Sequence, residues 1–88
     1  MIGLSAEAAA RLTAAARRAI AVEGEDYAAV PMVVPRRWTN QLRIQVWPGL
    51  WGKPVQEEPH GVVVLVKATD IIDWIRRRAH AQTTADHA

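Results

Sequence analysis

The clearest pattern in the chain is a run of aliphatic residues at positions 62–66, followed at once by residues with helical spacing. A short run rich in β-branched residues that follows a glycine is typical of a strand. Its lack of alternation favours a central strand with both faces covered. Thr69 or Asp70 then offers an N-cap, and apolar residues recur on one helical face with Trp74 at its edge. The pattern therefore predicts a buried strand and then an amphipathic helix that ends near Gln82.

A second helix is predicted near the N-terminus. Ser5 precedes an Ala-rich segment that continues to about Glu23, and Gly24 follows it, as is typical of helix start and stop signals. Small side chains allow close approach to a sheet or to another helix, although each buries little area. The apolar stripe of this helix consists of Leu4, Ala8, Leu12, Ala15, Ala19 and Val22, with Ala16 and Ile20 beside it.

Two more strands are expected between the helices. Residues 27–34 are mostly apolar, but Pro31 has no N–H donor, which places this segment at a sheet edge. Residues 41–47 alternate, so they indicate a half-buried strand whose apolar side is formed by Leu42, Ile44 and Val46. Residues 47–54 carry two prolines and two glycines and are predicted to form a loop, which residues 55–61 continue.

The order helix, strand, strand, strand, helix predicts an α+β fold. Its simplest form is a three-stranded, mostly antiparallel sheet with both helices packed on it. The length of 88 residues fits one small domain, expected over residues 1–82, with a disordered tail at 83–88. The chain has no cysteine, which fits a reducing, cytoplasmic location. It has neither a signal-peptide pattern nor an apolar run of about 18 residues, so no membrane association is expected.

The residues with catalytic potential do not form a recognisable site. The three histidines lack metal-binding spacing, and Glu57 and Glu58 are adjacent in an extended polar stretch, where neighbouring side chains point apart. Ser5 is the only serine and is expected to act as a helix cap. No glycine-rich phosphate-binding pattern occurs. The sequence therefore predicts a protein that is not an enzyme and that needs no metal or cofactor.

The basic residues form three groups, although the net charge is only +2. If the two helices lie side by side, two of these groups would share one surface suited to DNA phosphates. The alternative is that each group is simply a solvated helix face. The candidate nucleic-acid-binding residues are Arg17, Arg18, Arg36, Arg37, Arg76, Arg77 and Arg78.

The chain has four tryptophans and no phenylalanine. Trp47 and Trp74 are expected to be large core residues. Trp38 and Trp51 fall in predicted connections, where they would be partly exposed and could pack on a nucleic acid or on a protein. The candidate partner-binding residues are Trp38, Trp47, Leu50 and Trp51.

Two segments resemble small winged-helix proteins of the phage excisionase or MerR-like kind. Residues 4–12, Leu-Ser-Ala-Glu-Ala-Ala-Ala-Arg-Leu, are similar to the opening helix of that family, and residues 61–78 are similar to its wing strand and closing helix. Together they cover less than half of the chain. Residues 13–16 differ from the usual Leu-Gly-Val-Ser turn of that family. Residues 5–23 are therefore compatible either with one continuous helix or with a helix-turn-helix. The resemblance implies that Arg17 and Arg18 face the major groove.

Two functional hypotheses follow. The first is a small non-enzymatic accessory protein of phage or mobile-element type that binds duplex DNA. The second is a protein–protein interaction module, such as a virion connector component or an inhibitor of a host complex. In the second hypothesis residues 47–51 would anchor the partner, and the Ala-rich helix would allow a homo-oligomer to form.

Overall fold

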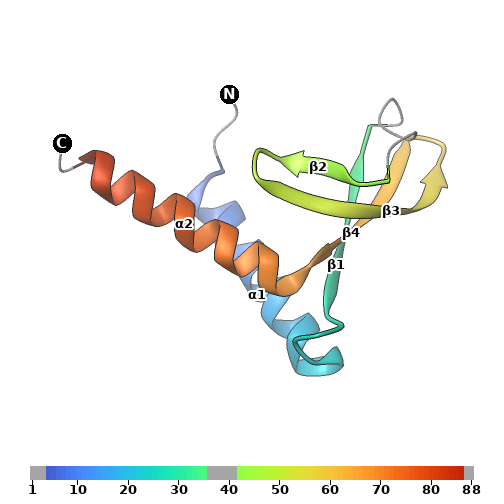
Figure 1. Cartoon of the computed structure of the whole chain (residues 1–88), viewed down its shortest axis with the longest axis horizontal. Helices are drawn as coiled ribbons and strands as arrows, with labels where there is room; N and C mark the ends of the chain where they lie inside the picture. The colour runs from blue at the N-terminus through green and yellow to red at the C-terminus, as the bar shows by residue number, and fades with distance from the viewer. Residues whose placement is uncertain (1–3, 36–41, 87–88) are drawn as a thin grey trace.

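The computed structural model describes residues 4–35 and 42–86, with side chains described as far as residue 78. The four described strands form an antiparallel sheet in the order β1-β4-β3-β2 (Figure 1). The α+β class is therefore confirmed, whereas the prediction of three strands was wrong. In chain order the elements are α1 (Ala6–Glu23), β1 (Ala29–Val34), β2 (Ile44–Trp47), β3 (Leu50–Glu58), β4 (Gly61–Lys67) and α2 (Ala68–Asp86).

The additional strand is β3, which occupies the segment that we expected to be a loop. Pro48 and Gly49 form a tight turn in which Trp47 pairs with Leu50. Gly49 has φ +85°, and a proline followed by a glycine with positive φ is typical of a type II turn. Pro54 lies next to a bulge, one of the few places in a sheet where proline is tolerated. These Pro and Gly residues therefore mark a turn and a bulge within a hairpin.

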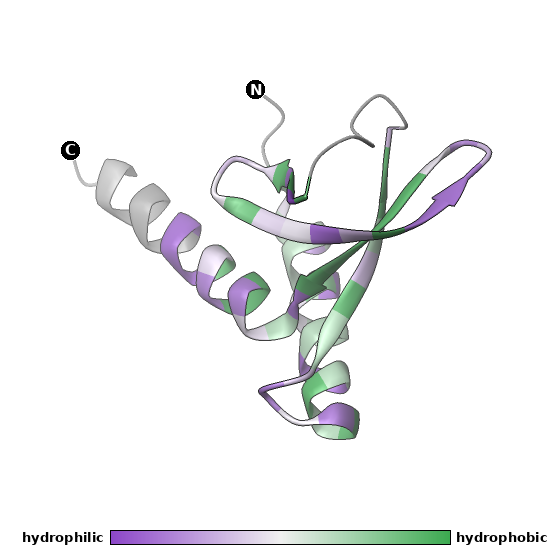
Figure 2. Ribbon diagram, turned by 45° about the vertical axis from the view of Figure 1, so that its right-hand side comes forward, coloured by the Kyte–Doolittle hydropathy of each residue, from purple (hydrophilic) through white to green (hydrophobic). Residues whose placement is uncertain are grey.

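Strand β4 lies between β1 and β3, as expected for a central strand. In Figure 2 it is a largely hydrophobic strand through the middle of the sheet. Val62, Val64 and Val66 are at most 2% exposed. Leu65, on the opposite face, is 37% exposed. The prediction that both faces are covered was therefore wrong, because both helices contribute to the core on one side only.

The two edge strands are shorter than predicted. Strand β1 contains Pro31 and lies at a sheet edge, as expected, but it begins at Ala29 and leaves Tyr27 exposed. Strand β2 begins at Ile44, which is buried. Leu42 lies before the strand and is 94% exposed, so its predicted place on the apolar side was wrong.

Helix α1 follows its sequence signals closely. The Ser5 hydroxyl accepts a hydrogen bond from the Ala8 N–H at 3.1 Å, and Gly24 ends the helix. Residues 6–23 form one continuous helix, which settles the choice left open between one helix and a helix-turn-helix. Ala16 is fully buried, whereas Val22 is 84% exposed. The apolar face is therefore centred on Ala16, and the inclusion of Val22 was wrong.

Helix α2 begins directly after β4, without a turn between them. The Ala68 N–H donates to the Ala28 carbonyl at 3.0 Å, which ties the helix start to the residue before β1. The expected N-cap at Thr69 or Asp70 was wrong, because both residues already lie inside the helix. The helical backbone also continues to Asp86, past the predicted end at Gln82.

The core lies between the two helices and one face of the sheet, which we call the inner face. Its largest fully buried side chains each contribute about 1.5–3 kcal/mol of burial free energy. Trp74 is 3% exposed, and its indole N–H donates to the Pro48 carbonyl at 2.9 Å, so α2 is fixed to the β2–β3 turn. The largest fully buried side chains of the core are Ile44, Leu50, Ile71, Val62, Val64 and Val66.

Candidate nucleic-acid interface

Basic and aromatic side chains are grouped on the sheet face opposite the helices, which we call the outer face. Side chains alternate between the two faces of a strand, and paired residues share a face. Lys53 pairs with Leu65, and Leu65 pairs with Pro31 on its other side. All three are exposed, so this row lies on the outer face.

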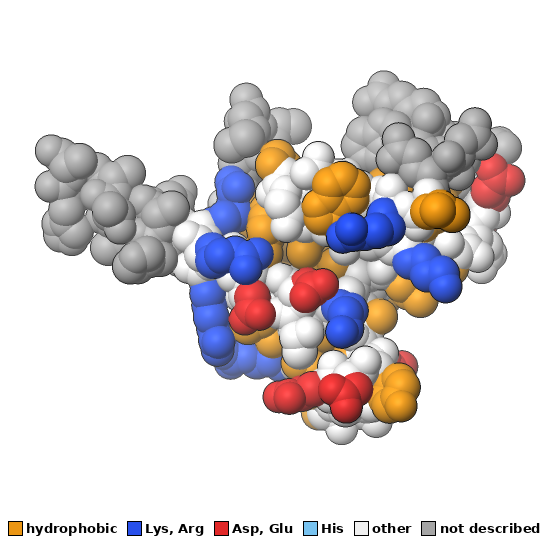
Figure 3. Space-filling model, in the orientation of Figure 1, with side chains coloured by type: hydrophobic (Ala, Val, Ile, Leu, Met, Phe, Trp, Pro, Cys, Tyr) orange, Lys and Arg blue, Asp and Glu red, His pale blue; other side chains and the backbone are white. Residues whose placement is uncertain are grey.

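Six residues surround a shallow depression of about 260 Å³ near the junction of the sheet and α2. We call them the outer-face cluster. Figure 3 shows Lys and Arg side chains beside hydrophobic side chains over the part of the molecule where β2, β3 and β4 lie. Apart from Gly52, which forms the floor, the lining residues are Arg43, Trp51, Lys53, Leu65, Lys67 and Asp70.

The centre of the cluster is a tryptophan in contact with an arginine. Trp51 pairs with Gln45, so Arg43, two residues before Gln45, falls on the same side. The Arg43 guanidinium carbon lies 5.0 Å from the centroid of the Trp51 ring. Trp51 is 41% exposed, which is unusual for the largest apolar side chain. The pair therefore combines a partly exposed aromatic ring with a positive charge over one of its faces.

The cluster is positively charged. Lys53 lies diagonally from Lys67 on the neighbouring strand, a placement that separates side chains by about 7–8 Å. Together with Arg43 they outnumber the single carboxylate, Asp70. Among the side chains that the structure describes, the one ion pair joins Glu7 and Arg11 on α1. The three cations of the cluster therefore remain available to an anionic ligand.

The arginines predicted from the sequence lie elsewhere. Arg17 and Arg18 are exposed on α1, and Arg76 and Arg77 are exposed on α2. The two helices pack against each other, and Figure 3 shows basic side chains along the side of the molecule that they form. Arg78 is half-buried, with its guanidinium carbon 4.8 Å from the centroid of the Trp74 ring. Arg36 and Arg37 lie outside the described residues.

The predicted partner-binding residues are separated by the fold. Leu50 is 1% exposed and belongs to the core. Trp47 is half-buried and packs on Trp74, with ring centroids 5.5 Å apart. Trp51 alone of the described candidates has a large exposed surface, and Trp38 lies outside the described residues. Residues 47–51 therefore present Trp51 to a ligand on the outer face and Trp47 to the interior.

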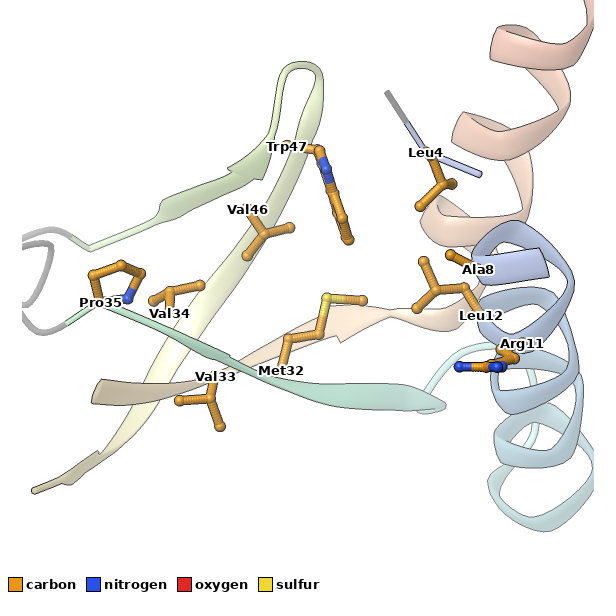
Figure 4. A pocket seen from close by; sticks show the side chains of 10 residues that line it. All are labelled: Leu4, Ala8, Arg11, Leu12, Met32, Val33, Val34, Pro35, Val46 and Trp47. Carbon is orange, nitrogen blue, oxygen red and sulfur yellow. The ribbon is translucent and has the colours of Figure 1, made fainter. Parts of the chain in front are cut away.

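An apolar groove of about 490 Å³ lies between α1 and the two sheet edges (Figure 4). Met32 of β1, Trp47 of β2 and Leu12 of α1 point towards one another across it. Arg11 is the one charged residue of its lining, and it pairs with Glu7. The groove therefore offers apolar contact area and little polar chemistry.

Sequence reasoning missed five members of the cluster, namely Arg43, Lys53, Leu65, Lys67 and Asp70. The alternation of residues 41–47 did indicate that Arg43 and Gln45 point away from the apolar side. Lys53 was assigned to a loop, so its pairing with β4 could not be foreseen. Once β3 is recognised as a strand, the same alternation places Trp51 and Lys53 on the outer face.

In the part of the chain with described side chains, no three His, Cys, Asp or Glu residues are grouped to hold a metal ion. None of the described helices combines the length and apolar character needed to cross a membrane. Comparison of the chain with protein-family models, curated proteins and solved structures gave no match.

Proposed function

We propose that this protein is a small, non-enzymatic DNA-binding protein and that its DNA contact is the outer-face cluster. The observation that carries the proposal is the grouping of Arg43, Lys53 and Lys67 around the exposed Trp51. Lysine and arginine supply the sequence-independent attraction to phosphates, and an exposed aromatic ring adds contact with a base or sugar. An accessory role in a phage or mobile element, acting in the cytoplasm, rests on the sequence resemblance and composition alone.

The geometry favours the outer face over the helical arginines. On α2, the aromatic ring nearest in sequence to the exposed arginines is that of Trp74, which is buried. On the outer face, Lys53 and Lys67 lie on the adjacent paired strands β3 and β4, and Arg43 lies just before β2 with its guanidinium over the Trp51 ring. The helical arginines are then a secondary source of long-range attraction.

The proposal is tested by charge reversal on each surface. The double variant K53E/K67E should weaken binding of a labelled oligodeoxynucleotide at low salt by at least about tenfold, because two phosphate contacts become repulsive. The matched control R17E/R18E changes the net charge equally but alters α1. It should weaken binding by less than about threefold through the overall field. Fluorescence anisotropy at several salt concentrations measures both, and circular dichroism confirms that both variants fold.

Two results would contradict the proposal. A wild-type protein that binds no DNA at low salt would exclude the function. A larger loss for R17E/R18E than for K53E/K67E would place the DNA contact on the helices instead of the outer face.

A second candidate function is a protein–protein interaction module. The observation that favours it is the apolar groove between α1, β1 and β2, whose area suits a hydrophobic side chain of a protein partner. The same titration distinguishes the two functions. Absence of DNA binding at low salt, with a folded protein, would leave the groove as the candidate contact.

A further inference from the structure

The outer-face cluster differs from the surfaces that proteins use to read duplex DNA. A major groove admits a helix or a two-stranded ribbon, which project from the body of a protein. Here the cluster consists of residues on β3 and β4, of Arg43 just before β2 and of Asp70 at the start of α2, and its aromatic ring lies on the sheet surface. In a duplex, each base face is already stacked on its neighbours. Trp51 could therefore contact a base face only if the base were unpaired or removed from the stack.

We infer that the ligand of this surface is single-stranded DNA and that Trp51 stacks on one of its bases; this inference rests on the proposed function. The combination of a stacking platform with a basic track is typical of surfaces that bind unpaired strands. Trp51 and Lys53 are two residues apart on β3, so they are separated by about 6.6–6.8 Å along the strand. Lys67 lies beside Trp51 on the neighbouring strand, since the register that pairs Lys53 with Leu65 places residue 67 opposite residue 51. A base on Trp51 thus places the backbone of the same extended strand within reach of the two lysines.

The neighbouring residues support the same arrangement. The Arg43 guanidinium lies over one face of the Trp51 ring, so a base would stack on the other face or take the place of the guanidinium, with the positive charge close by in either case. Leu65 is 37% exposed beside Lys53 and gives a second apolar surface between the two lysines. Leu65 and Lys67 on β4 thus lie opposite residues 53 and 51 of β3, so a strand that runs along β3 from Trp51 to Lys53 would have both side chains beside it. The aromatic ring and Leu65 would contact bases, and the two lysines would contact the phosphates of an unpaired strand.

The test compares three DNA probes of equal length with the full chain at low and moderate salt. They are a mixed-sequence single strand, the same sequence as a duplex, and an abasic strand with the same number of phosphates. We expect the single strand to bind at least about tenfold more tightly than the other two, because only it offers free base faces. Trp51→Ala should remove this advantage, whereas Trp51→Phe should retain it to within about threefold. Trp51 is partly exposed, and thermal melting confirms that both variants fold.

The outcomes separate this inference from the proposed function. Equal, salt-sensitive binding of all three probes would overturn the inference and leave a DNA-binding protein that contacts phosphates alone. Tighter binding of the duplex, or a single-strand advantage that survives Trp51→Ala, would also overturn it. An RNA strand of the same sequence that binds at least about tenfold more tightly would overturn the assignment to DNA. Binding of none of the probes would overturn both proposals.

Discussion

Gly52 shows how one residue sets the spacing between neighbouring strands. It is buried on the inner face, where a Cβ atom would lie 2.3 Å from Val64 Cγ1 and 2.9 Å from Val66 Cγ2. The Leu65 carbonyl oxygen, a backbone atom, would also lie at 2.9 Å. Since β4 is the central strand, it is held on both sides and has little freedom to move away. Glycine is therefore required here for space.

Gly52→Ala should lower the free energy of unfolding by about 1–3 kcal/mol, because the added methyl group overpacks the core between β3 and β4. Chemical denaturation followed by circular dichroism measures the change. Lys53→Ala is the control, since it alters the adjacent exposed residue and should change stability by less than about 0.5 kcal/mol. Equal stability of Gly52→Ala and the wild type would show that the strands are not packed as closely as described.

At the scale of elements, the contact between α2 and the β2–β3 turn holds the two layers together. Trp74 lies on α2, stacks on Trp47 at the end of β2, and donates its indole N–H to the Pro48 carbonyl. A residue 26 positions away in the chain thus fixes the turn that precedes β3. Because β3 carries Trp51 and Lys53, this contact also positions the outer-face cluster.

Trp74→Phe should destabilise the protein by about 1–2 kcal/mol, because it removes the hydrogen bond to Pro48 and leaves a small cavity. Trp51→Phe is the matched control, since the same substitution at a partly exposed position should cost less than about 0.5 kcal/mol. Urea denaturation of both variants measures the difference. Equal effects of the two substitutions would argue against the role of Trp74 as the link between α2 and the turn.

The elements that were predicted well are those with strong local signals. Ser5 and Gly24 bounded α1, and the aliphatic run with its following helical pattern identified β4 and α2. Strand β3 was missed because Pro48 and Gly49 resemble loop residues until the hairpin pairing is known. The bulge after Pro54 depends likewise on the partner strand, which is distant in sequence. Local sequence patterns predict which helices and strands form. The pairing of the strands decides whether a proline ends a strand, lies in a hairpin turn or lies next to a bulge.

The candidate site could be predicted only in part for the same reason. Partial exposure of Trp51 was expected because it fell in a predicted connection; the exposure is confirmed, although Trp51 lies in β3. Its association with Lys53, Leu65 and Lys67 depends on the register of β3 against β4, which the sequence pattern alone does not show. Groups of consecutive arginines were chosen from the sequence as candidate DNA-binding residues. The cluster instead consists of single basic residues that the fold brings together.

For the whole molecule, we assign different roles to the two surfaces. The helices and the inner face make the core, whereas none of the described helices packs on the outer face, which carries cations around an aromatic ring. A net charge of +2 is too small to hold DNA by overall attraction alone, so the placement of the charges has to matter. The central claim is therefore that DNA contacts the outer face.

The most direct test is nuclear magnetic resonance of the ¹⁵N-labelled protein during titration with a short DNA single strand at low salt. We predict the largest shift changes at the Trp51 indole N–H and at the amides of Lys53, Leu65 and Lys67. The amides of Arg17 and Arg18 on α1 should change little. Changes centred on α1 and α2, with the Trp51 indole signal unmoved, would contradict a DNA contact on the outer face.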